Sequence, residues 1–338
     1  MGTRQRQLTP SFSSLFGQEK AKFLLGRALE SGKLAHAYLF RGPDGVGKQL
    51  FARSLAAAVN CRQRQGPDAC GHCPSCRKYS SANHPDFLVI SPEKGAIRID
   101  RIREMIQALS YPPYESSVRV VLLEDIHTMR PEAANSLLKT LEEPPDNNLL
   151  ILTAAASRDV LITISSRCQV VPFFSLGQEE TAQILVRELP ELDHETARLL
   201  ARLSEGCPGQ ALLLYRKEMV AIWRVVVALI SDPGHDGSRD VGMLLQAAET
   251  MASLKEDLLP LLGLLRIWLR DLLVADSLGQ DGYESVAMGE GVRGKKLRLW
   301  NFRQLFDKLH AVDRAEKELG RNCSRTLVCE VLLFQLQQ

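Results

Sequence analysis

Short apolar runs alternate with stretches of helical spacing through the first half of the 338-residue chain. Runs of this kind, separated by helical patterns, are typical of a parallel sheet with crossover helices. Between the third and fourth runs, Pro131 suits the first position of a helix, and Pro144 and Pro145 end that helix. The pattern therefore predicts an α/β domain with strands at residues 37–40, 87–90, 118–123, 149–153 and 169–173.

The second half of the chain has a different pattern. From about residue 176 the strand-like runs stop and helical spacing takes over, with a Gly-Cys-Pro-Gly stretch at 206–209. Beyond about residue 218 the helices are longer, and a polar, glycine-rich stretch at 278–294 separates two of them. Because no heptad run or short repeat accompanies them, a helical bundle is the simplest interpretation. We expect three domains, at residues 1–175, 176–217 and 218–338.

Composition places the chain among ordinary globular proteins, with 45% hydrophobic and 24% charged residues. The balance of 42 basic against 40 acidic side chains excludes a uniformly basic nucleic-acid coat. The N-terminus has no apolar stretch of secretory length, and no segment approaches about 18 uninterrupted apolar residues. We therefore expect a soluble, cytoplasmic protein with no membrane segment.

A phosphate-binding loop is indicated by the sequence RGPDGVGKQL at residues 41–50. Gly42, Gly45, Gly47 and Lys48 match the pattern G-x-x-x-x-G-K and stand between a predicted strand and a predicted helix, as the motif requires. Such glycines let backbone N–H groups approach phosphate oxygens, and the lysine reaches the outer phosphates. The pattern favours binding of ATP or ADP, and the alternative is a strand-to-helix turn without a ligand.

Three positions near this loop depart from what ATP hydrolysis requires. Gln49 stands where a serine or threonine hydroxyl usually holds Mg²⁺. The strand at 118–123 is followed by Glu124 and then Asp125, whereas a hydrolysing site uses an aspartate for the metal and then a glutamate that aligns water. Glu124 thus falls on the metal position and Asp125 on the water position. Because phosphoryl transfer depends on positioning, we expect poor Mg²⁺ binding and no autonomous ATPase activity.

Four of the eight cysteines crowd into one short polar segment. Cys61, Cys70, Cys73 and Cys76 read C-x8-C-x2-C-x2-C, which predicts a tetrahedral Zn²⁺ site. Four thiolates leave no coordination position for a substrate, so the metal would be structural and would hold the insert at 61–76 together. The alternative is a redox pair made from Cys73 and Cys76.

The P-loop and the cysteine segment, together with NSLLKTLEEPP at 135–145 and SSRCQ at 165–169, resemble the delta-prime subunits of the bacterial DNA polymerase III clamp loader, within the AAA+ family. The resemblance covers most of residues 12–215. It implies a P-loop AAA+ domain with a parallel five-stranded sheet, a small helical lid and an all-α C-terminal collar. It also implies a hetero-pentamer with gamma/tau and delta subunits, which brings the chain to the sliding clamp and to primer-template DNA.

The same resemblance implies roles for single residues. Arg167 matches the arginine that reaches the nucleotide of a neighbouring subunit in the ring, where it would act as a catalytic arginine finger. Ala154 falls on the family's polar sensor position, and Gly209 falls on the lid position that carries an arginine in motor subunits. Together with Gln49 and the reversed carboxylates, these departures favour a delta-prime stator. An ATP-hydrolysing gamma/tau-type motor is the alternative.

Less specific explanations stand beside these assignments. Arg167 could instead pin a loop by pairing with a carboxylate, as arginines near strand ends commonly do. Arg98, Arg101 and Arg103 either face DNA phosphates or form a solvated helix face. A further functional class is a zinc-knuckle module that binds nucleic acid and retains a vestigial nucleotide fold.

Overall fold

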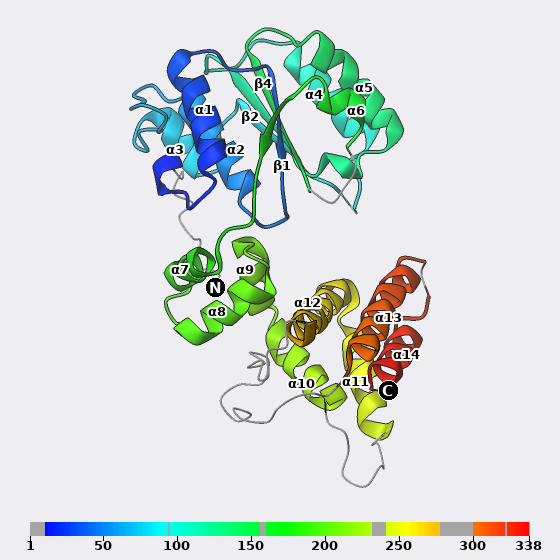
Figure 1. Cartoon of the computed structure of the whole chain (residues 1–338). Helices are drawn as coiled ribbons and strands as arrows, with labels where there is room; N and C mark the ends of the chain where they lie inside the picture. Colours follow the sequence, from blue (N-terminus) through cyan, green and yellow to red (C-terminus); the bar gives the residue numbers. More distant parts are fainter. Residues whose placement is uncertain are drawn as a thin grey trace. The chain divides into compact units, whose positions relative to one another are not determined.

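The computed structural model describes residues 11–93, 95–155, 160–231, 241–277, 300–321 and 323–337. The chain falls into two compact units, one made of Met1–Ala197 with Ser204–Gln210 and the other of Arg198–Leu203 with Ala211–Gln338. Figure 1 shows an α/β unit built around a sheet and a unit built from helices. Among the described helices, none combines the length and the apolar character needed to cross a membrane.

A five-stranded sheet forms the centre of the α/β unit. All its strand pairs are parallel, and the strand order is β2-β3-β4-β1-β5. Each predicted strand is present within a residue or two of its expected bounds, as β1 (Ala37–Arg41), β2 (Phe87–Ile90), β3 (Arg119–Leu123), β4 (Asn148–Ala154) and β5 (Gln169–Pro172). Because the carboxyl ends of parallel strands share one edge, the segments that follow β1, β3 and β4 meet there.

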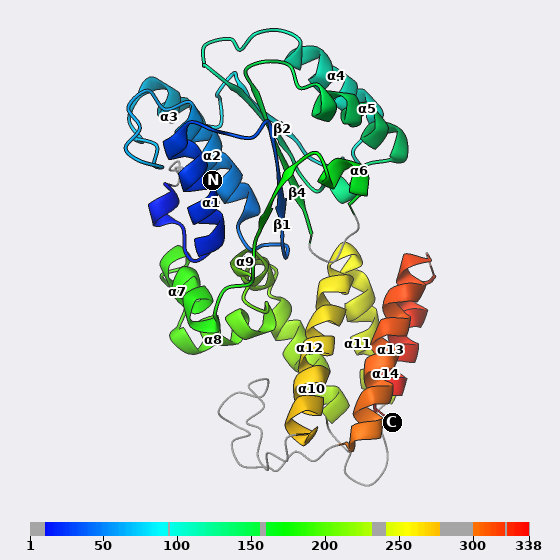
Figure 2. The same cartoon turned by 45° about the horizontal axis from the view of Figure 1, so that its top comes forward.

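Helices cover both faces of this sheet, as Figures 1 and 2 show. One face is covered by α1 (Glu19–Ser31), α2 (Lys48–Val59) and α3 (Pro74–Ser80), and the other by α4 (Ile99–Leu109), α5 (Pro131–Glu142) and α6 (Ile162–Ser165). Side chains alternate along each strand, so Phe40 joins the first core and Leu39 the second. A strand buried on both faces is apolar throughout, which explains the continuous runs in the sequence.

Short 3₁₀ turns, at Phe12–Ser14 and Ile126–Thr128, complete the α/β unit. Beyond the sheet come α7 (Gln178–Glu188), α8 (His194–Leu203) and α9 (Pro208–Arg216). The last two cross the division between the compact units, since residues 204–210 belong with the α/β unit and their neighbours on both sides do not. The predicted domain boundaries near 175 and 217 therefore stay a prediction.

The second unit is helical, as expected. Its helices α10 (Met219–Ser231), α11 (Val241–Ser253), α12 (Leu258–Ser277), α13 (Phe302–Gly320) and α14 (Arg325–Gln337) pack as α11 on α14, α12 on α13 and α13 on α14, and a 3₁₀ turn at Lys255–Asp257 precedes α12. Arg266 on α12 pairs with Asp313, 3.5 Å away, and with Glu316 on α13. The fold class of a parallel α/β domain followed by helices is thus confirmed. The polar stretch at 278–294 lies outside the described residues.

Candidate functional site

The P-loop joins β1 to α2, and its glycines are needed for two different reasons. Gly45 and Gly47 have φ angles of 80° and 106°, which side-chain-bearing residues rarely adopt. Gly42 lies against β5, and a Cβ atom there would stand 2.5 Å from the carbonyl oxygen of Phe173. The loop therefore has the backbone form of a phosphate-binding loop, held against the neighbouring strand.

Lys48, the first residue of α2, forms its hydrogen bonds with residues of its own loop. Its ammonium donates to the carbonyl oxygens of Gly42 at 2.7 Å and Pro43 at 2.8 Å, and it pairs with Asp44 at 3.2 Å. The lysine side chain is only 6% exposed. A phosphate would have to replace at least the Asp44 contact. Gln49, next along the helix, is exposed to solvent.

The two carboxylates after β3 have different surroundings. Glu124 is buried, and its Oε2 accepts a hydrogen bond of 2.6 Å from the Ser91 hydroxyl at the end of β2. Asp125 begins the 3₁₀ turn with a left-handed φ of 51°, and its backbone N–H donates to Thr153 Oγ1 at 3.0 Å. Burial and the nearby Asp44 raise the pKa of Asp125, opposed by His127 and Lys48. The charges of the loop therefore influence Asp125, while Glu124 is hydrogen-bonded to Ser91, directly after β2.

The sensor position on β4 is used for backbone packing. Ala154 is fully buried, and its carbonyl oxygen accepts a hydrogen bond of 3.3 Å from Gly42 N–H. The hydroxyl oxygen of Thr153, just before it, accepts the hydrogen bond from the Asp125 N–H. Sequence reasoning passed over Ser91 and Thr153, because a single serine or threonine at a strand end carries no distinctive pattern.

Gly209 lies directly against the P-loop. Its N–H donates to the carbonyl oxygen of Gly45 at 2.8 Å, and a Cβ atom at Gly209 would stand 2.8 Å from Gly45 Cα. A Cβ at Gly45 would in turn stand 2.6 Å from the backbone nitrogen of Gln210. Two backbones are thus in contact at the position where, by the resemblance, motor subunits carry an arginine.

Arg167 lies between α6 and β5 and is engaged by its own chain. Its Nη2 donates to Glu142 Oε1 at 2.5 Å, and its Nη1 donates to the carbonyl oxygen of Thr163 at 2.8 Å. The arginine side chain is 33% exposed and the glutamate side chain 48% exposed. In the single chain, therefore, the arginine has the carboxylate partner that the loop-pinning explanation requires, on an accessible surface.

The four clustered cysteines converge as the spacing predicts. Their Sγ atoms all lie within 4.8 Å of one another, and those of Cys70 and Cys76 are 3.9 Å apart. Four thiolates around one zinc at about 2.3 Å would be roughly 3.8 Å apart. Cys73 and Cys76 are buried, and Cys61 and Cys70 are half-buried. The segment can therefore hold one tetrahedral metal ion with little movement.

Backbone N–H groups support the sulfurs as they would support thiolates. The amide of Cys70 donates to Cys61 Sγ at 3.2 Å, that of Cys73 to Cys70 Sγ at 3.3 Å, and that of Cys76 to Cys73 Sγ at 3.5 Å. Cys73 is also the N-cap of α3, where Pro74 follows it. Burial raises the pKa of Cys73, but hydrogen bonds from the Cys76 and Arg62 amides and from neighbouring thiols outweigh it and lower the pKa to about 6.

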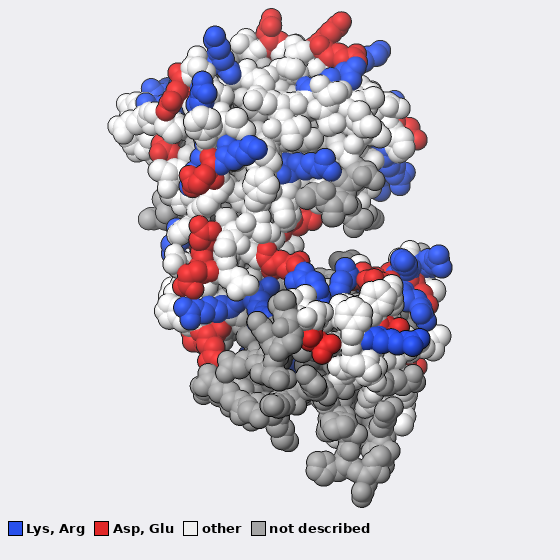
Figure 3. Space-filling model, in the orientation of Figure 1, with Lys and Arg blue, Asp and Glu red and all other residues white. Residues whose placement is uncertain are grey.

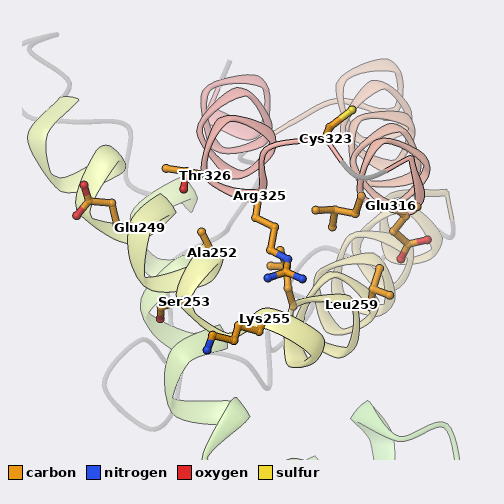
Figure 4. A pocket seen from close by; sticks show the side chains of 12 residues that line it. Glu249, Ala252, Ser253, Lys255, Leu259, Glu316, Cys323, Arg325 and Thr326 are labelled. Atoms are coloured by element: carbon orange, nitrogen blue, oxygen red, sulfur yellow. The ribbon is translucent and has the colours of Figure 1, made fainter. Parts of the chain in front are cut away.

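A cavity in the helical unit contains none of the predicted site residues. It has a volume of about 880 Å³ and lies among the ends of α11, α12, α13 and α14, where Figure 4 shows Glu249, Lys255 and Arg325 around it. On the face drawn in Figure 3, the described lysines and arginines are interspersed with aspartates and glutamates. That face therefore carries no broad basic field of the kind that non-specific nucleic-acid binding requires.

Fold and site together define an α/β protein with a parallel five-stranded sheet, a loop of the P-loop type after β1 and a cluster of four cysteines. A family model described as "DNA polymerase III, delta subunit" matches residues 17–177. The resemblance to delta-prime subunits is thus confirmed by this match, which spans slightly less than half of the chain.

Curated relatives extend this result. The chain is similar to DNA polymerase III subunit delta-prime of Pseudomonas aeruginosa (37% identity, covering 54% of this chain and 56% of the relative). It is also similar to subunit delta-prime of Bacillus subtilis (28% identity, 95% and 96%) and to subunit tau of Escherichia coli (33% identity, 60% and 32%). The chain thus spans about half the length of the first of these relatives and a third of the last.

A solved structure of a DNA polymerase III gamma subunit-related protein from Thermotoga maritima shares 19% of its residues with this chain. The match covers 94% of this chain and 98% of that one, with a TM-score of 0.46, which is too weak a likeness to add to the sequence matches.

Proposed function

We propose that this chain is a delta-prime-type subunit of a DNA polymerase III clamp loader. In this role it does not hydrolyse ATP itself but serves as a stator in a hetero-pentamer with gamma/tau and delta subunits. Its residues 176–217 would form the lid and 218–338 the collar of that ring. Through the complex, the chain would take part in loading the sliding clamp onto primer-template DNA. The similarity to delta-prime subunits of Pseudomonas aeruginosa and Bacillus subtilis supports this proposal.

The observation that carries the non-hydrolysing role is the contact between Gly209 and Gly45. The backbone of Gly209 stands 2.8 Å from that of Gly45, measured from its N–H nitrogen to the carbonyl oxygen, so no side chain fits between them. An arginine that reaches the nucleotide from this lid position therefore has no counterpart here. Two further features support the same role. Gln49 carries no hydroxyl for Mg²⁺, and one carboxylate oxygen of Glu124 is already bonded to the Ser91 hydroxyl.

Arg167 is the residue through which the chain would contribute to catalysis. A guanidinium supplied to a neighbour's nucleotide stabilises charge that develops on the transferred phosphoryl group. Arg167 is accessible, at 33% exposure, and stands at the end of the short α6. We infer that it completes the ATPase site of the adjacent motor subunit in the ring.

Zinc is the metal that we assign to Cys61, Cys70, Cys73 and Cys76. Four sulfur donors suit Zn²⁺, and a full coordination sphere leaves no place for a substrate. When bound, the ion would tie the end of α2 to the start of α3. Any ATP or ADP held by Gly42, Gly45, Gly47 and Lys48 would serve structure rather than turnover.

The match to a tau subunit keeps a motor role as the second candidate, since it aligns 208 residues at 33% identity. One purification separates the two. The unmodified chain should co-assemble with gamma/tau and delta subunits and show no ATP turnover alone. Turnover by the lone chain that Lys48→Ala abolishes would establish the motor instead, and failure to co-assemble would contradict both candidates.

The reconstituted complex tests Arg167. Arg167→Ala should leave assembly and metal content unchanged while it slows DNA-dependent ATP hydrolysis and clamp loading. Removing a finger costs about 10³ to 10⁵ at the site it serves, but the bulk rate falls less because other sites keep theirs. Arg167→Lys, which keeps the charge and loses the planar fork, should rescue little. A complex with Arg167→Ala that matches the unmodified one in both assays would make Arg167 a structural residue.

A further inference from the structure

Arg167 is not free to reach a neighbour in the single chain. Both terminal nitrogens of its guanidinium are engaged, Nη2 by Glu142 at 2.5 Å and Nη1 by the carbonyl oxygen of Thr163 at 2.8 Å. A guanidinium binds a phosphoryl group best through two parallel N–H donors. At least one of the two existing hydrogen bonds must therefore break before Arg167 can bind a phosphate through two parallel N–H groups.

Glu142 is placed to hold the arginine reversibly. It is the last residue of α5, where the unpaired carbonyl groups of a helix end favour a nearby cation. Both partners remain open to solvent, with the glutamate side chain 48% and the arginine side chain 33% exposed. An ion pair as accessible as this one is weak, whereas a nucleotide phosphate with several charged oxygens competes strongly for the same guanidinium.

We propose that Glu142 is a positioning residue that holds Arg167 against its own subunit until a phosphate in the neighbouring subunit displaces the carboxylate. The inference rests on the proposed trans-acting role of Arg167 and adds a regulatory step to it. The bond that Arg167 donates to the carbonyl oxygen of Thr163 can persist during the exchange, because it uses Nη1 and not the Nη2 that Glu142 binds. Engagement of the neighbour's site then requires two events, docking of the subunits and release of Glu142.

The chain offers a closely matched control for this idea. Glu143, the next residue, is also exposed and lies at the C-cap of α5, but it is not a partner of Arg167. Glu142→Gln and Glu143→Gln remove the same charge from adjacent positions. Only the first removes the carboxylate that holds the arginine. A general effect of charge on the docking surface would appear in both variants.

The first measurement uses the full-length chain alone. Phenylglyoxal modifies accessible guanidinium groups, and peptide mass spectrometry reports each arginine separately. Glu142→Gln should raise the modification rate of Arg167 several-fold relative to that of Arg103, an exposed arginine on α4, and Glu143→Gln should not. Equal rates at Arg167 in all three proteins would show that the pair does not hold the arginine, and the proposal would be overturned.

The second measurement uses the reconstituted complex. Association of the chain with motor subunits loaded with ADP and beryllium fluoride should strengthen by about two- to five-fold in Glu142→Gln, the range expected when an accessible ion pair no longer competes. In an Arg167→Ala background this gain should shrink to the value for Glu143→Gln. A gain of the same size in both backgrounds would assign Glu142 a role independent of Arg167 and overturn the proposal.

The two failures can be told apart. If Arg167→Ala leaves nucleotide-dependent association unchanged, the trans-acting role itself is wrong. If Arg167→Ala weakens association but Glu142→Gln has no effect in either assay, the trans-acting role of Arg167 is supported and the holding role of Glu142 is refuted.

Discussion

Replacing Gly209 by alanine tests the backbone contact with Gly45 on which the proposed non-hydrolysing role rests. Gly209 is the second residue of α9 and has no left-handed backbone conformation, so alanine is acceptable to its own backbone. The new Cβ would stand 2.8 Å from Gly45 Cα and 3.0 Å from Gly45 O. Non-bonded carbon atoms normally approach to about 3.5–4.0 Å. One backbone must therefore move by several tenths of an ångström.

Two opposing effects determine how much Gly209→Ala changes the free energy of unfolding. Overpacking of a rigid contact costs about 1–3 kcal/mol, while alanine in place of glycine within a helix gains about 0.5–1 kcal/mol. We expect Gly209→Ala to lower the free energy of unfolding by about 0.5–2 kcal/mol. For a unit of about 200 residues this corresponds to a fall of roughly 1–8 °C in the melting temperature.

The assay combines thermal unfolding of the full-length chain with hydrogen exchange at the Gly209 amide, which donates to Gly45 O. Gly26→Ala is the matched control, because Gly26 is helical, lies in the same unit and has its nearest neighbour, a Pro67 carbon, at an ordinary 3.7 Å. The control should hold or gain stability. If Gly209→Ala melts like the control and its amide stays protected, the two backbones are not packed as tightly as we argue. Gly209→Arg should displace α9 from the loop without restoring ATP turnover.

Three further predictions follow from the same structure. Metal analysis of protein prepared without chelator should find one zinc per chain, and Cys73→Ser should lower both zinc content and melting temperature; protein that lacks zinc yet melts unchanged would contradict the site. Asp86, buried just before β2, accepts backbone N–H bonds from Tyr114, Glu115 and Ser116. Burial raises its pKa, but these bonds and the nearby Arg119 outweigh burial and lower the pKa, so its stabilisation is present above about pH 4 and is lost as the pH falls through the folded pKa. Asp86→Asn should therefore flatten the acid-side fall of the unfolding free energy measured in urea, and an unaltered slope would exclude this cause. Gln49→Thr should not restore ATP turnover, because Glu124 stays bonded to Ser91, and a turnover that appears with this single change would refute the reasoning.

Local pattern was enough to predict the elements and the convergence of the four cysteines. The five strands were expected near their observed bounds, because a strand buried on both faces must be apolar along its length. The four cysteines were predicted from spacing alone, since ligands so close in sequence can reach one ion without knowledge of the rest of the fold. The glycines of the P-loop were recognisable for a similar reason, because they meet backbone demands within a few residues.

The partners of the chemical groups were decided by tertiary structure. Glu124 meets Ser91 because β3 lies beside β2 in the sheet, and no spacing along the chain encodes that neighbour. Arg167 meets Glu142 because α6 packs beside α5. Gly209 could be aligned with a missing arginine from the sequence, but only the fold brings its backbone onto Gly45. A residue's type and periodicity are local properties, whereas the group that it faces depends on how distant segments pack, and in this protein that packing determines which charges of the P-loop and of the arginine site are already paired.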